Sequence, residues 1–510
     1  MALINSVISW LMKKRIHQIE LFMKYPHEVQ QEWLKKLIHS ARNTEFGKSL
    51  DFKSVQTVDE FRNRLPLNDY ETLKPYIERL RKGEQNLLWP SEIKFFAKSS
   101  GTTNDKSKFI PVSQEALEEC HFKGGKDMLS IYCNSHPDTN LFSGKAIAMG
   151  GTHEIVEVNN ESYYQGDLSA ILIRNLPIWV EYLRTPDRSI ALMDEWEAKI
   201  EKMALATIQH DVTNISGVPS WTLLLFKKVL QLTGRANLLE VWPNFELFVH
   251  GGVNFIPYQE QFRKILPSEK VNFLETYNAS EGFFGIRDRQ HADDMLLMLD
   301  YGIYYEFIPM DDNGYDVSRI ISLNEVIQGM NYAIVITTNG GLWRYILGDT
   351  VKFTSVKPYR IQVTGRTRNF INAFGEELIV ENAEKAISIA CHRCNVSINE
   401  FTAAPVYYDQ KNGAHEWLIE FEVPPGDLGF FTDTLDNALK SLNSDYEAKR
   451  YHDLLLGEPV IRVLPSGTFY RWLKSKGKLG GQNKVPRLAN ERKYVEEILA
   501  LEYKNLPSAG

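Results

Sequence analysis

The chain has 510 residues, of which 43% are hydrophobic and 24% are charged, so its composition is that of an ordinary globular protein with two or three domains. Its formal net charge of −7 at pH 7 argues against general nucleic-acid binding, which usually requires a basic domain or stripe. Its four cysteines are too few for a disulfide scaffold and fit a reduced, cytoplasmic setting. We therefore expect a protein whose partners are small molecules.

The first dozen residues are apolar, and the basic residues 13–15 follow them. A signal peptide has the opposite order, and the apolar stretch is too short to span a bilayer. We expect a helix that packs on the body of the protein, with contact to a membrane surface as the alternative. Further helices are predicted from Pro26, over residues 113–132, over 195–209 and over 219–232, because apolar residues recur there at helical spacing.

A hydroxyl-rich loop follows the strand-like residues 93–97. It contains Ser99, Ser100, Gly101, Thr102 and Thr103, and Lys106 and Lys108 add positive charge. Glycine permits a tight turn, and hydroxyls and backbone amides donate hydrogen bonds, so such a loop can surround an anion. The glycine that precedes the lysine of a P-loop is missing, which argues against that motif. The loop predicts a phosphate site of another kind, with a plain surface turn as the alternative.

Two later strands also end in unusual residues. The apolar residues 245–249 run into His250, Gly251 and Gly252, and paired glycines leave room for a flat ring such as adenine. The next strand, residues 271–276, leads into Tyr277, Asn278, Ala279, Ser280 and Glu281. Open α/β sheets bind ligands at the carboxyl ends of their strands, so both segments are candidates for a ligand site.

A large mixed α/β region ends near residues 366–369, and the remaining chain reads as strand, helix, two strands and helix. A basic loop over residues 476–484 follows, and a mobile loop of this kind can carry a catalytic lysine. Cys391 and Cys394 have the spacing of a metal or redox pair. No second pair accompanies them, so we expect them to be incidental residues at a helix end.

Several of these segments resemble the nucleotide motifs of adenylate-forming enzymes when they are read together. They are SSGTT at 99–103 with KFIP at 108–111, YNASE at 277–281, GLWRYILGD at 341–349, TGR at 364–366 and QNKVPR at 482–487. Within that superfamily, YYEFIP at 304–309, GLWRY at 341–345 and KVPR at 484–487 are most similar to the plant auxin-responsive acyl acid amido synthetases, the Gretchen Hagen family. The likeness extends from about residue 26 to about residue 487.

This resemblance implies an α/β, adenylate-forming fold. A large mixed α/β N-terminal domain, residues 1–367, would bind the nucleotide and the acyl acid. A smaller, mobile α+β C-terminal domain, residues 368–510, would carry the catalytic lysine. From the charge, the cysteines and the short apolar N-terminus we further expect a cytoplasmic enzyme, monomeric or weakly dimeric, that has no transmembrane segment and binds no nucleic acid.

The activity that the resemblance implies is an ATP-dependent ligation. A carboxylic acid would be adenylated to give acyl-AMP and pyrophosphate, and the amine of an amino acid would then take the acyl group. Adenylation brings two anions together, so cations and a bound Mg²⁺ would lower its barrier. One alternative keeps adenylation but uses a thiol such as coenzyme A as acceptor, and another is a non-catalytic nucleotide-binding protein.

The resemblance also implies roles for individual residues. The β- and γ-phosphates would be held by Ser99, Ser100, Gly101, Thr102 and Thr103, together with Lys106 or Lys108. The adenine would be flanked by Gly251, Gly252 and Tyr277, and the rest of that motif is Asn278, Ala279 and Ser280. Glu281 would bind Mg²⁺, Asp349 would accept hydrogen bonds from the ribose, Arg366 would contact ribose or phosphate, and Lys484 would bridge the carboxylate and the nucleotide. The catalytic set is thus Lys484, Glu281 and Asp349. The plainer alternatives are a helix-start carboxylate for Glu281, a turn residue for Asp349 and a surface lysine for Lys484.

The helix after the hydroxyl-rich loop differs from the plant pattern. The plant enzymes carry arginines there, one of which can contact the acyl acid, whereas residues 117–126 contain none. We expect His121, Phe122 and Lys123 to line an acyl-acid pocket of different shape. Auxin, jasmonate or benzoate is therefore not assumed as the substrate.

Overall fold

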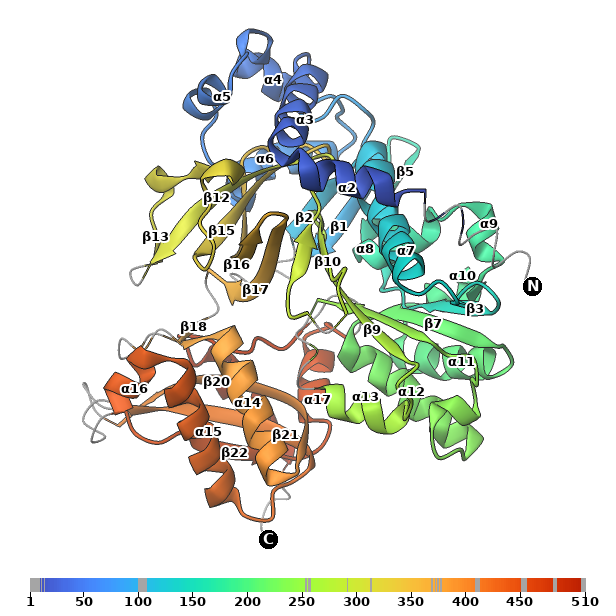
Figure 1. Ribbon diagram of the computed structural model, residues 1–510, viewed down its shortest axis with the longest axis vertical. Coiled ribbons are helices and arrows are strands. Elements are labelled where there is room, and N and C mark those ends of the chain that lie inside the picture. Colours follow the sequence, from blue (N-terminus) through green and yellow to red (C-terminus); the bar gives the residue numbers. More distant parts are fainter. Residues whose placement is uncertain are drawn as a thin grey trace. The chain divides into compact units, whose positions relative to one another are not determined.

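The computed structural model describes residues 10, 12, 14–99, 108–252, 255, 258–290, 292–311, 314–367, 370–371, 373, 376, 378–408, 413–450, 456–479 and 484–505. The chain forms two compact units (Figure 1). The first contains residues 1–253, 265–347 and 351–362, and the second contains 254–264, 348–350 and 363–510. The single boundary after residue 367 stays a prediction.

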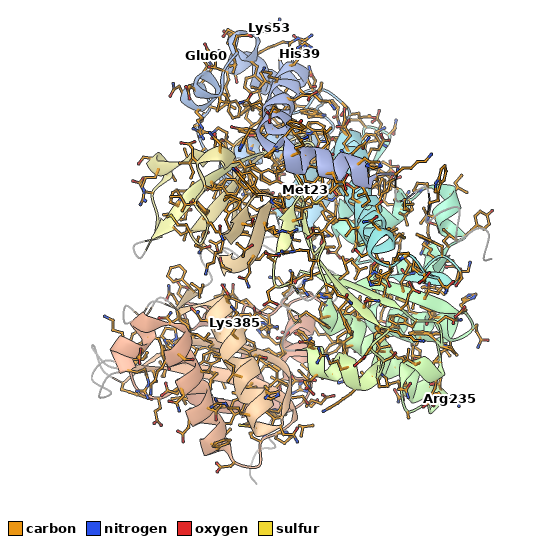
Figure 2. All side chains as sticks on the ribbon, in the orientation of Figure 1. Met23, His39, Lys53, Glu60, Arg235 and Lys385 are labelled. Carbon is orange, nitrogen blue, oxygen red and sulfur yellow. The ribbon has the colours of Figure 1, made fainter. Side chains whose placement is uncertain are left out.

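Helices form the N-terminal part of the first unit. They are α2 (Ile16–Lys24), α3 (Pro26–Ala41), α4 (Glu45–Ser49), the 3₁₀ turn η1 (Phe52–Ser54), α5 (Val58–Arg64) and α6 (Tyr70–Leu80). Helix α3 begins at Pro26 as predicted, because proline at the first helical position loses no hydrogen bond. Helix α5 begins with a reciprocal capping box between Thr57 and Glu60, the latter labelled in Figure 2.

The side chain of Gln30 joins α3 to the body of the first unit. Its amide nitrogen donates to the carbonyl oxygens of Leu299 and Ile303, both at 2.9 Å, and its amide oxygen accepts from the backbone nitrogen of Tyr305 at 2.9 Å. Gln30 is only 3% exposed. Three satisfied hydrogen bonds explain why a polar residue is stable at this buried position.

A four-stranded sheet in the first unit carries the hydroxyl-rich loop. Its order is β2-β1-β5-β4, with β1 Phe95–Ser99, β2 Lys108–Val112, β4 His153–Val158 and β5 Glu161–Gly166. Strands β1 and β2 are antiparallel, and β1 and β5 are parallel. The helical segment predicted after this loop divides into a π-helical turn, Ala116–Phe122, and α7, Lys123–Ser135.

A larger sheet has the order β13-β12-β15-β16-β17-β11-β10-β9-β8-β7-β3-β6, with β14 paired to β12. Its strands are β3 Lys145–Ala148, β6 Arg184–Thr185, β7 Val212–Gly217, β8 Leu247–Gly251, β9 Asn272–Ala279, β10 Gly282–Ile286, β11 Met295–Leu297, β12 Ile303–Asp311, β13 Gly314–Tyr315, β14 Ile321–Ser322, β15 Asn331–Thr338, β16 Tyr345–Val356 and β17 Tyr359–Arg366. Strands β3, β7, β8 and β9 are parallel, so their carboxyl ends share one edge.

Further helices connect these strands. They are α8 Leu168–Arg174, α9 Ile178–Glu181, α10 Arg188–Ala191, α11 Trp196–Ile208, α12 Pro219–Thr233 and α13 Gln259–Ile265, with the short 3₁₀ turns η3 Leu238–Glu240, η5 Val317–Arg319 and η6 Leu323–Glu325. The predicted helices at 195–209 and 219–232 correspond to α11 and α12. Helix α12 ends at Gly234, whose φ of +66° suits a glycine terminator.

The C-terminal residues of the second unit form a small α+β structure. Its elements are β18 Phe370–Ile371, β19 Leu378–Ile379, α14 Val380–Cys394, β20 Ser397–Tyr407, β21 Gly413–Val423, α15 Leu428–Leu442, α16 Ser444–Arg450, β22 Val460–Leu464, α17 Thr468–Ser475 and α18 Lys493–Asn505. The sheet order is β20-β21-β22. Figure 1 shows α14 and α15 side by side over one face of this sheet.

Cys391 and Cys394 end α14, as predicted. Burial raises the pKa of the Cys391 thiol to about 12, which disfavours the thiolate that metal binding or redox chemistry would use. None of the helices in the described part of the chain has both the length and the hydropathy that crossing a bilayer requires.

Candidate active site

The two ends of the hydroxyl-rich loop are fixed by strand pairing. Strand β1 ends at Ser99, strand β2 begins at Lys108, and these two residues are paired across the ladder. The Lys108 ammonium lies 5.8 Å from the centre of the Tyr70 ring, and the Tyr70 hydroxyl accepts a 3.0 Å hydrogen bond from the backbone nitrogen of Phe109. The remaining predicted loop residues, Ser100, Gly101, Thr102, Thr103 and Lys106, lie outside the described residues.

The predicted adenine segment lies at the ends of two adjacent parallel strands. Gly251 ends β8 and is paired with Thr276 of β9. A Cβ atom on Gly251 would lie 2.4 Å from the carbonyl oxygen of Thr276, so only glycine permits this approach. Gly252 follows with a φ of +82° and turns the chain. Tyr277 is 8% exposed and packs on Phe284, with ring centres 4.9 Å apart.

Glu281 lies in the short turn between β9 and β10. Ala279 and Gly282 are paired at the ends of these strands, which leaves Ser280 and Glu281 as the turn residues. The placement in a hairpin contradicts the alternative that Glu281 starts a helix. The structure thus brings Gly251, Gly252, Tyr277, Asn278 and Glu281 to the neighbouring strands β8, β9 and β10.

In the second unit, residues 348–350 of β16 run beside the end of β17. The backbone nitrogen of Thr367 donates to the carbonyl oxygen of Gly348 at 2.9 Å, and the hydroxyls of Thr350 and Thr364 are 2.9 Å apart. Asp349, only 8% exposed, lies in the first of these segments. Arg366 ends the second, although its side chain is outside the described residues.

Lys484 precedes a segment that is firmly attached to β20. The Thr402 hydroxyl donates to the carbonyl oxygen of Pro486 at 2.6 Å, and the backbone nitrogen of Ala403 donates to the carbonyl oxygen of Arg487 at 2.9 Å. Lys484 itself is partly exposed. The backbone two residues after this lysine is therefore held by the sheet.

Arg487 is a further organising residue of this segment, and the motif analysis gave it no role. It is 7% exposed, forms ion pairs with Glu384 and Glu400, and donates a 3.0 Å hydrogen bond to the Tyr258 hydroxyl. Its place in the KVPR motif was the only feature of the sequence that pointed to this role. Its contacts fix the segment that follows Lys484.

The first part of the motif at residues 341–349, GLWRY, is buried in the core of the protein. Trp343 is fully buried, and its indole nitrogen donates to the carbonyl oxygen of Leu88 at 3.0 Å. Arg344 is 4% exposed and forms a bidentate pair with Glu306 at 2.9 and 3.1 Å. These side chains support the strands of the motif.

The residues predicted for the acyl-acid pocket have different surroundings. His121 is 5% exposed, and its Nδ1 finds no partner among the described residues. Lys123 forms a 3.0 Å ion pair with Asp300, which also pairs with Arg15 at 2.7 Å. Phe122 is half-buried. That His121, Phe122 and Lys123 contact an acyl acid stays a prediction.

Lowering the pH from 7 to 5 is expected to destabilise the protein by about 2 kcal/mol for each of two buried histidines. Burial lowers the pKa of His121 to about 4, and burial together with Arg287 lowers the pKa of His250 to about 3. The unfolded chain binds these protons near pH 6.5, whereas the folded protein does not, so stability falls as the pH drops from 6.5 towards the folded pKa values.

Urea unfolding at pH 7, 6 and 5 measures this effect. The substitution His121→Asn is expected to remove about 2 kcal/mol of the pH-dependent loss. The matched control is His39→Asn at an exposed histidine of α3, labelled in Figure 2, which should leave the loss unchanged. An identical pH dependence in wild type and His121→Asn would contradict the assignment.

Two cavities of the first unit contain none of the residues predicted from motifs. One of about 390 Å³ lies beside Glu181, Arg184 and His210. The other, of about 430 Å³, is lined by His153, Arg174, Arg188, Ser189 and Leu192. These side chains come from a strand, a helix end and a short helix, so no local pattern could indicate that they meet.

This architecture places the chain among the proteins with the adenylate-forming fold. The solved structure of the GH3.15 acyl acid amido synthetase matches with a TM-score of 0.77 at 16% identity, over 96% of both chains. A 2-hydroxyisobutyryl-CoA ligase bound to 2-HIB-AMP matches with a TM-score of 0.60 at 11% identity, over 93% of this chain and 90% of the other. The predicted fold class is confirmed.

Family models identify the chain more closely. The GH3 family N-terminal domain matches residues 15–271, half of the chain, the central domain matches 296–366 and the C-terminal domain matches 381–493. The chain belongs to the GH3 family, which confirms the resemblance found in its motifs. The indole-3-acetic acid-amido synthetase GH3.4 of Arabidopsis thaliana is 24% identical, over 93% of this chain and 91% of the relative.

Proposed function

We propose that this chain is an ATP-dependent acyl acid amido synthetase. In the first step, a carboxylate oxygen of the acid would form a bond to the α-phosphorus of ATP, and pyrophosphate would leave. In the second step, the amine of an amino acid would attack the acyl carbon, lose a proton and displace AMP. The observation that carries this proposal is membership of the GH3 family over nearly the whole chain, with the nucleotide motifs at strand ends.

We assign the nucleotide to the residues that the motifs predict. The hydroxyl-rich loop would hold the β- and γ-phosphates, because its base at Ser99 and Lys108 is fixed by pairing. Gly251 and Tyr277 would flank the adenine, since they lie towards the carboxyl ends of the adjacent parallel strands β8 and β9. Asp349 and Arg366, on neighbouring strands of the second unit, would contact the ribose and phosphates.

Mg²⁺ fits the chemistry of Glu281. This cation keeps several waters and is usually held by one or two carboxylates together with substrate phosphates. Glu281 offers one carboxylate on a tight hairpin beside the strand ends. When bound, the cation would draw charge from the phosphates, and Glu281 would fix its place.

Lys484 is proposed to stabilise the charge that develops as the carboxylate meets the nucleotide. A lysine is a compact point charge on a flexible stem, which suits a group used in one step only. The anchored residues 485–487 would keep its backbone in place while the side chain moves. We further propose that the smaller domain, residues 368–510, moves between the two steps.

The proposed function predicts which substrate is required for the release of pyrophosphate and which for the release of AMP. Pyrophosphate release from ATP should depend on a carboxylic acid, found by screening a panel of acids. AMP release in the second step should depend on an added amino acid and not on coenzyme A. The measurement is a coupled assay of both products with each acceptor in turn.

The opposite dependence, on coenzyme A and not on amino acids, would favour the thiol-acceptor alternative and overturn the amide-forming assignment. ATP binding without pyrophosphate release for any acid would favour a non-catalytic nucleotide-binding protein. Wild-type protein incubated without acid is the control for background ATP hydrolysis.

A further inference from the structure

The larger of the two cavities described above has the chemistry of an anion site. We call it the arginine pocket: His153, Arg174, Arg188, Ser189 and Leu192 line about 430 Å³. This volume falls within the roughly 300–1,000 Å³ of typical small-molecule sites. Four of the five lining residues can donate hydrogen bonds, and none is acidic. The pocket therefore suits a small ligand with a negative group.

Arg174, the last residue of α8, is held by an aromatic ring. Its guanidinium lies 4.0 Å from the centre of the Tyr164 ring and donates a 2.9 Å hydrogen bond to that tyrosine's hydroxyl. Tyr164 is in turn stacked on Phe95 of β1, with ring centres 5.4 Å apart. Within the described part of the chain, no carboxylate lies at ion-pair distance from Arg174. Its charge is thus preorganised but not neutralised.

Arg188 shares its carboxylate partner with a second arginine. Its Nε atom is 2.7 Å from Glu181, and Arg184 pairs with the same carboxylate at 2.8 Å. One negative charge therefore serves two guanidinium groups. Its Nη2 atom also donates a 3.2 Å hydrogen bond to the carbonyl oxygen of Leu176, and Arg188 is 40% exposed, so its remaining N–H groups are accessible to a ligand. Two guanidinium groups at one cavity offer charge-assisted donors to a carboxylate.

Of the nearby acidic groups, Asp187 and Asp167 are hydrogen-bonded to other groups. The exposed Asp194 acts on His153, whose pKa is lowered by burial and by Arg174 and raised in part by this carboxylate. Asp187 accepts from the Ser189 hydroxyl at 2.6 Å and caps α10. Asp167 accepts from the backbone nitrogen of Thr152 at 2.7 Å. The fully buried Lys199 donates to the carbonyl oxygens of Gly150 and Gly151 at 2.6 and 3.0 Å. These contacts fix the polypeptide that leads into His153.

Strand register relates the arginine pocket to the hydroxyl-rich loop. Gly166 of β5 is paired with His153 on one side and with Ala97 of β1 on the other. Paired residues of adjacent strands project to the same face of a sheet, and strands are about 4.8 Å apart. His153 and Ala97 therefore lie on one face, about 10 Å apart. Ala97 is two residues before Ser99, where the predicted phosphate loop begins.

We propose that the arginine pocket binds the α-carboxylate of the amino acid acceptor, an inference that rests on the proposed function. The acyl acid also has a carboxylate, but adenylation removes its charge. Fixed arginines would stabilise that reactant more than the adenylate and would raise the barrier. The acceptor's carboxylate stays charged throughout the reaction, so it benefits from permanent cationic partners. Leu192 adds an apolar wall for the rest of the acceptor.

The test compares each amino acid with the amine that lacks only its α-carboxylate, for example L-leucine with 3-methylbutylamine. In the wild type, the amino acid should be the better acceptor in kcat/KM. The substitution Arg174→Gln should raise the KM for the amino acid about tenfold or more, because a charge-assisted bidentate contact is lost. It should leave the KM for the amine unchanged. Arg174→Lys, which keeps the charge but not the fork, should recover part of the loss.

Arg188→Gln serves as a second variant if Arg174→Gln fails to fold. Arg235→Gln is the matched control, since Arg235 is exposed in the same unit, is labelled in Figure 2 and has no role in the pocket. Binding of L-leucine and 3-methylbutylamine, followed by saturation-transfer NMR, gives a readout without turnover. Only the L-leucine signal should weaken in Arg174→Gln.

Each contrary result has a distinct meaning. A raised KM for the acid in pyrophosphate release would assign the pocket to the acyl acid, and a raised KM for ATP would assign it to a phosphate; either overturns the proposal. Equal rises in KM for the amino acid and the amine would show that Arg174 has only a structural role. No change in the kinetics or in the NMR signals would show that the pocket does not bind the acceptor. Failure of the proposed function is recognised separately, because wild-type protein would then release no pyrophosphate with any acid.

Discussion

Replacing Lys484 with alanine is expected to slow adenylation by about 10²–10³-fold while ATP affinity changes by less than about twofold. The proposed contact of Lys484 is with charge that develops during the step, so its loss should appear in the rate and not in ground-state binding. Acid-dependent ATP–pyrophosphate exchange measures the rate, and equilibrium dialysis with ATP measures the affinity.

The matched control is Lys478→Ala, in the basic segment that also contains Lys484. It should behave as the wild type, because it removes the same charge from the segment without touching the anchored residues that follow Lys484. Lys484→Arg should stay impaired, since a planar guanidinium cannot replace a compact ammonium in this geometry. A Lys484→Ala protein with more than a tenth of wild-type exchange would contradict the assigned role.

The substitution Arg344→Met is expected to lower the free energy of unfolding by about 3–5 kcal/mol. Arg344 and Glu306 are 4% and 1% exposed, and their two hydrogen bonds are 2.9 and 3.1 Å long. Arg344 also donates to the carbonyl oxygens of Arg62 and Leu65 at 2.9 and 2.6 Å. Its removal leaves a buried carboxylate and two carbonyl groups with fewer partners, and urea unfolding followed by tryptophan fluorescence measures the loss.

Two further variants test the cause of this loss of stability. Arg62→Met removes the other arginine bound to Glu306, but Arg62 is 19% exposed, so its loss should cost less. Combining Arg344→Met with Glu306→Gln removes the buried carboxylate charge that Arg344 no longer neutralises and should restore part of the stability. A loss below about 1 kcal/mol for Arg344→Met would contradict the importance of the buried pair.

Motif order and helix signals predicted the fold class and many elements. Pro26 indicated the start of α3, and the segments at 195–209 and 219–232 are α11 and α12, because their signals are local. The hairpin of β4 and β5 was not predicted. Residues 153–158 of β4 are mostly exposed or half-buried, so they lack the apolar alternation that makes a strand recognisable.

The candidate site was predictable only where its residues are close in sequence. Tyr277 to Ala279 end β9, and Ser280 and Glu281 follow it directly, so a sequence pattern could place them together. The roles of Trp343 and Arg344 could not be inferred, because a motif does not reveal that its side chains are buried beside Leu88 and Glu306. The arginine pocket was missed for another reason: its residues are brought together by sheet register and helix ends.

Because strands β1 and β2 are paired at the ends of the hydroxyl-rich loop, the length of this loop can change with little effect on the stability of the protein. Ser99 and Lys108 are neighbours across a ladder, so the sheet already brings the ends of residues 100–107 together. Closing a longer connection over the same base would cost little, since doubling its length adds only about 0.6 kcal/mol. Insertions here should therefore change the melting temperature little, and selection can alter the length of the hydroxyl-rich segment without first acquiring extra thermal stability.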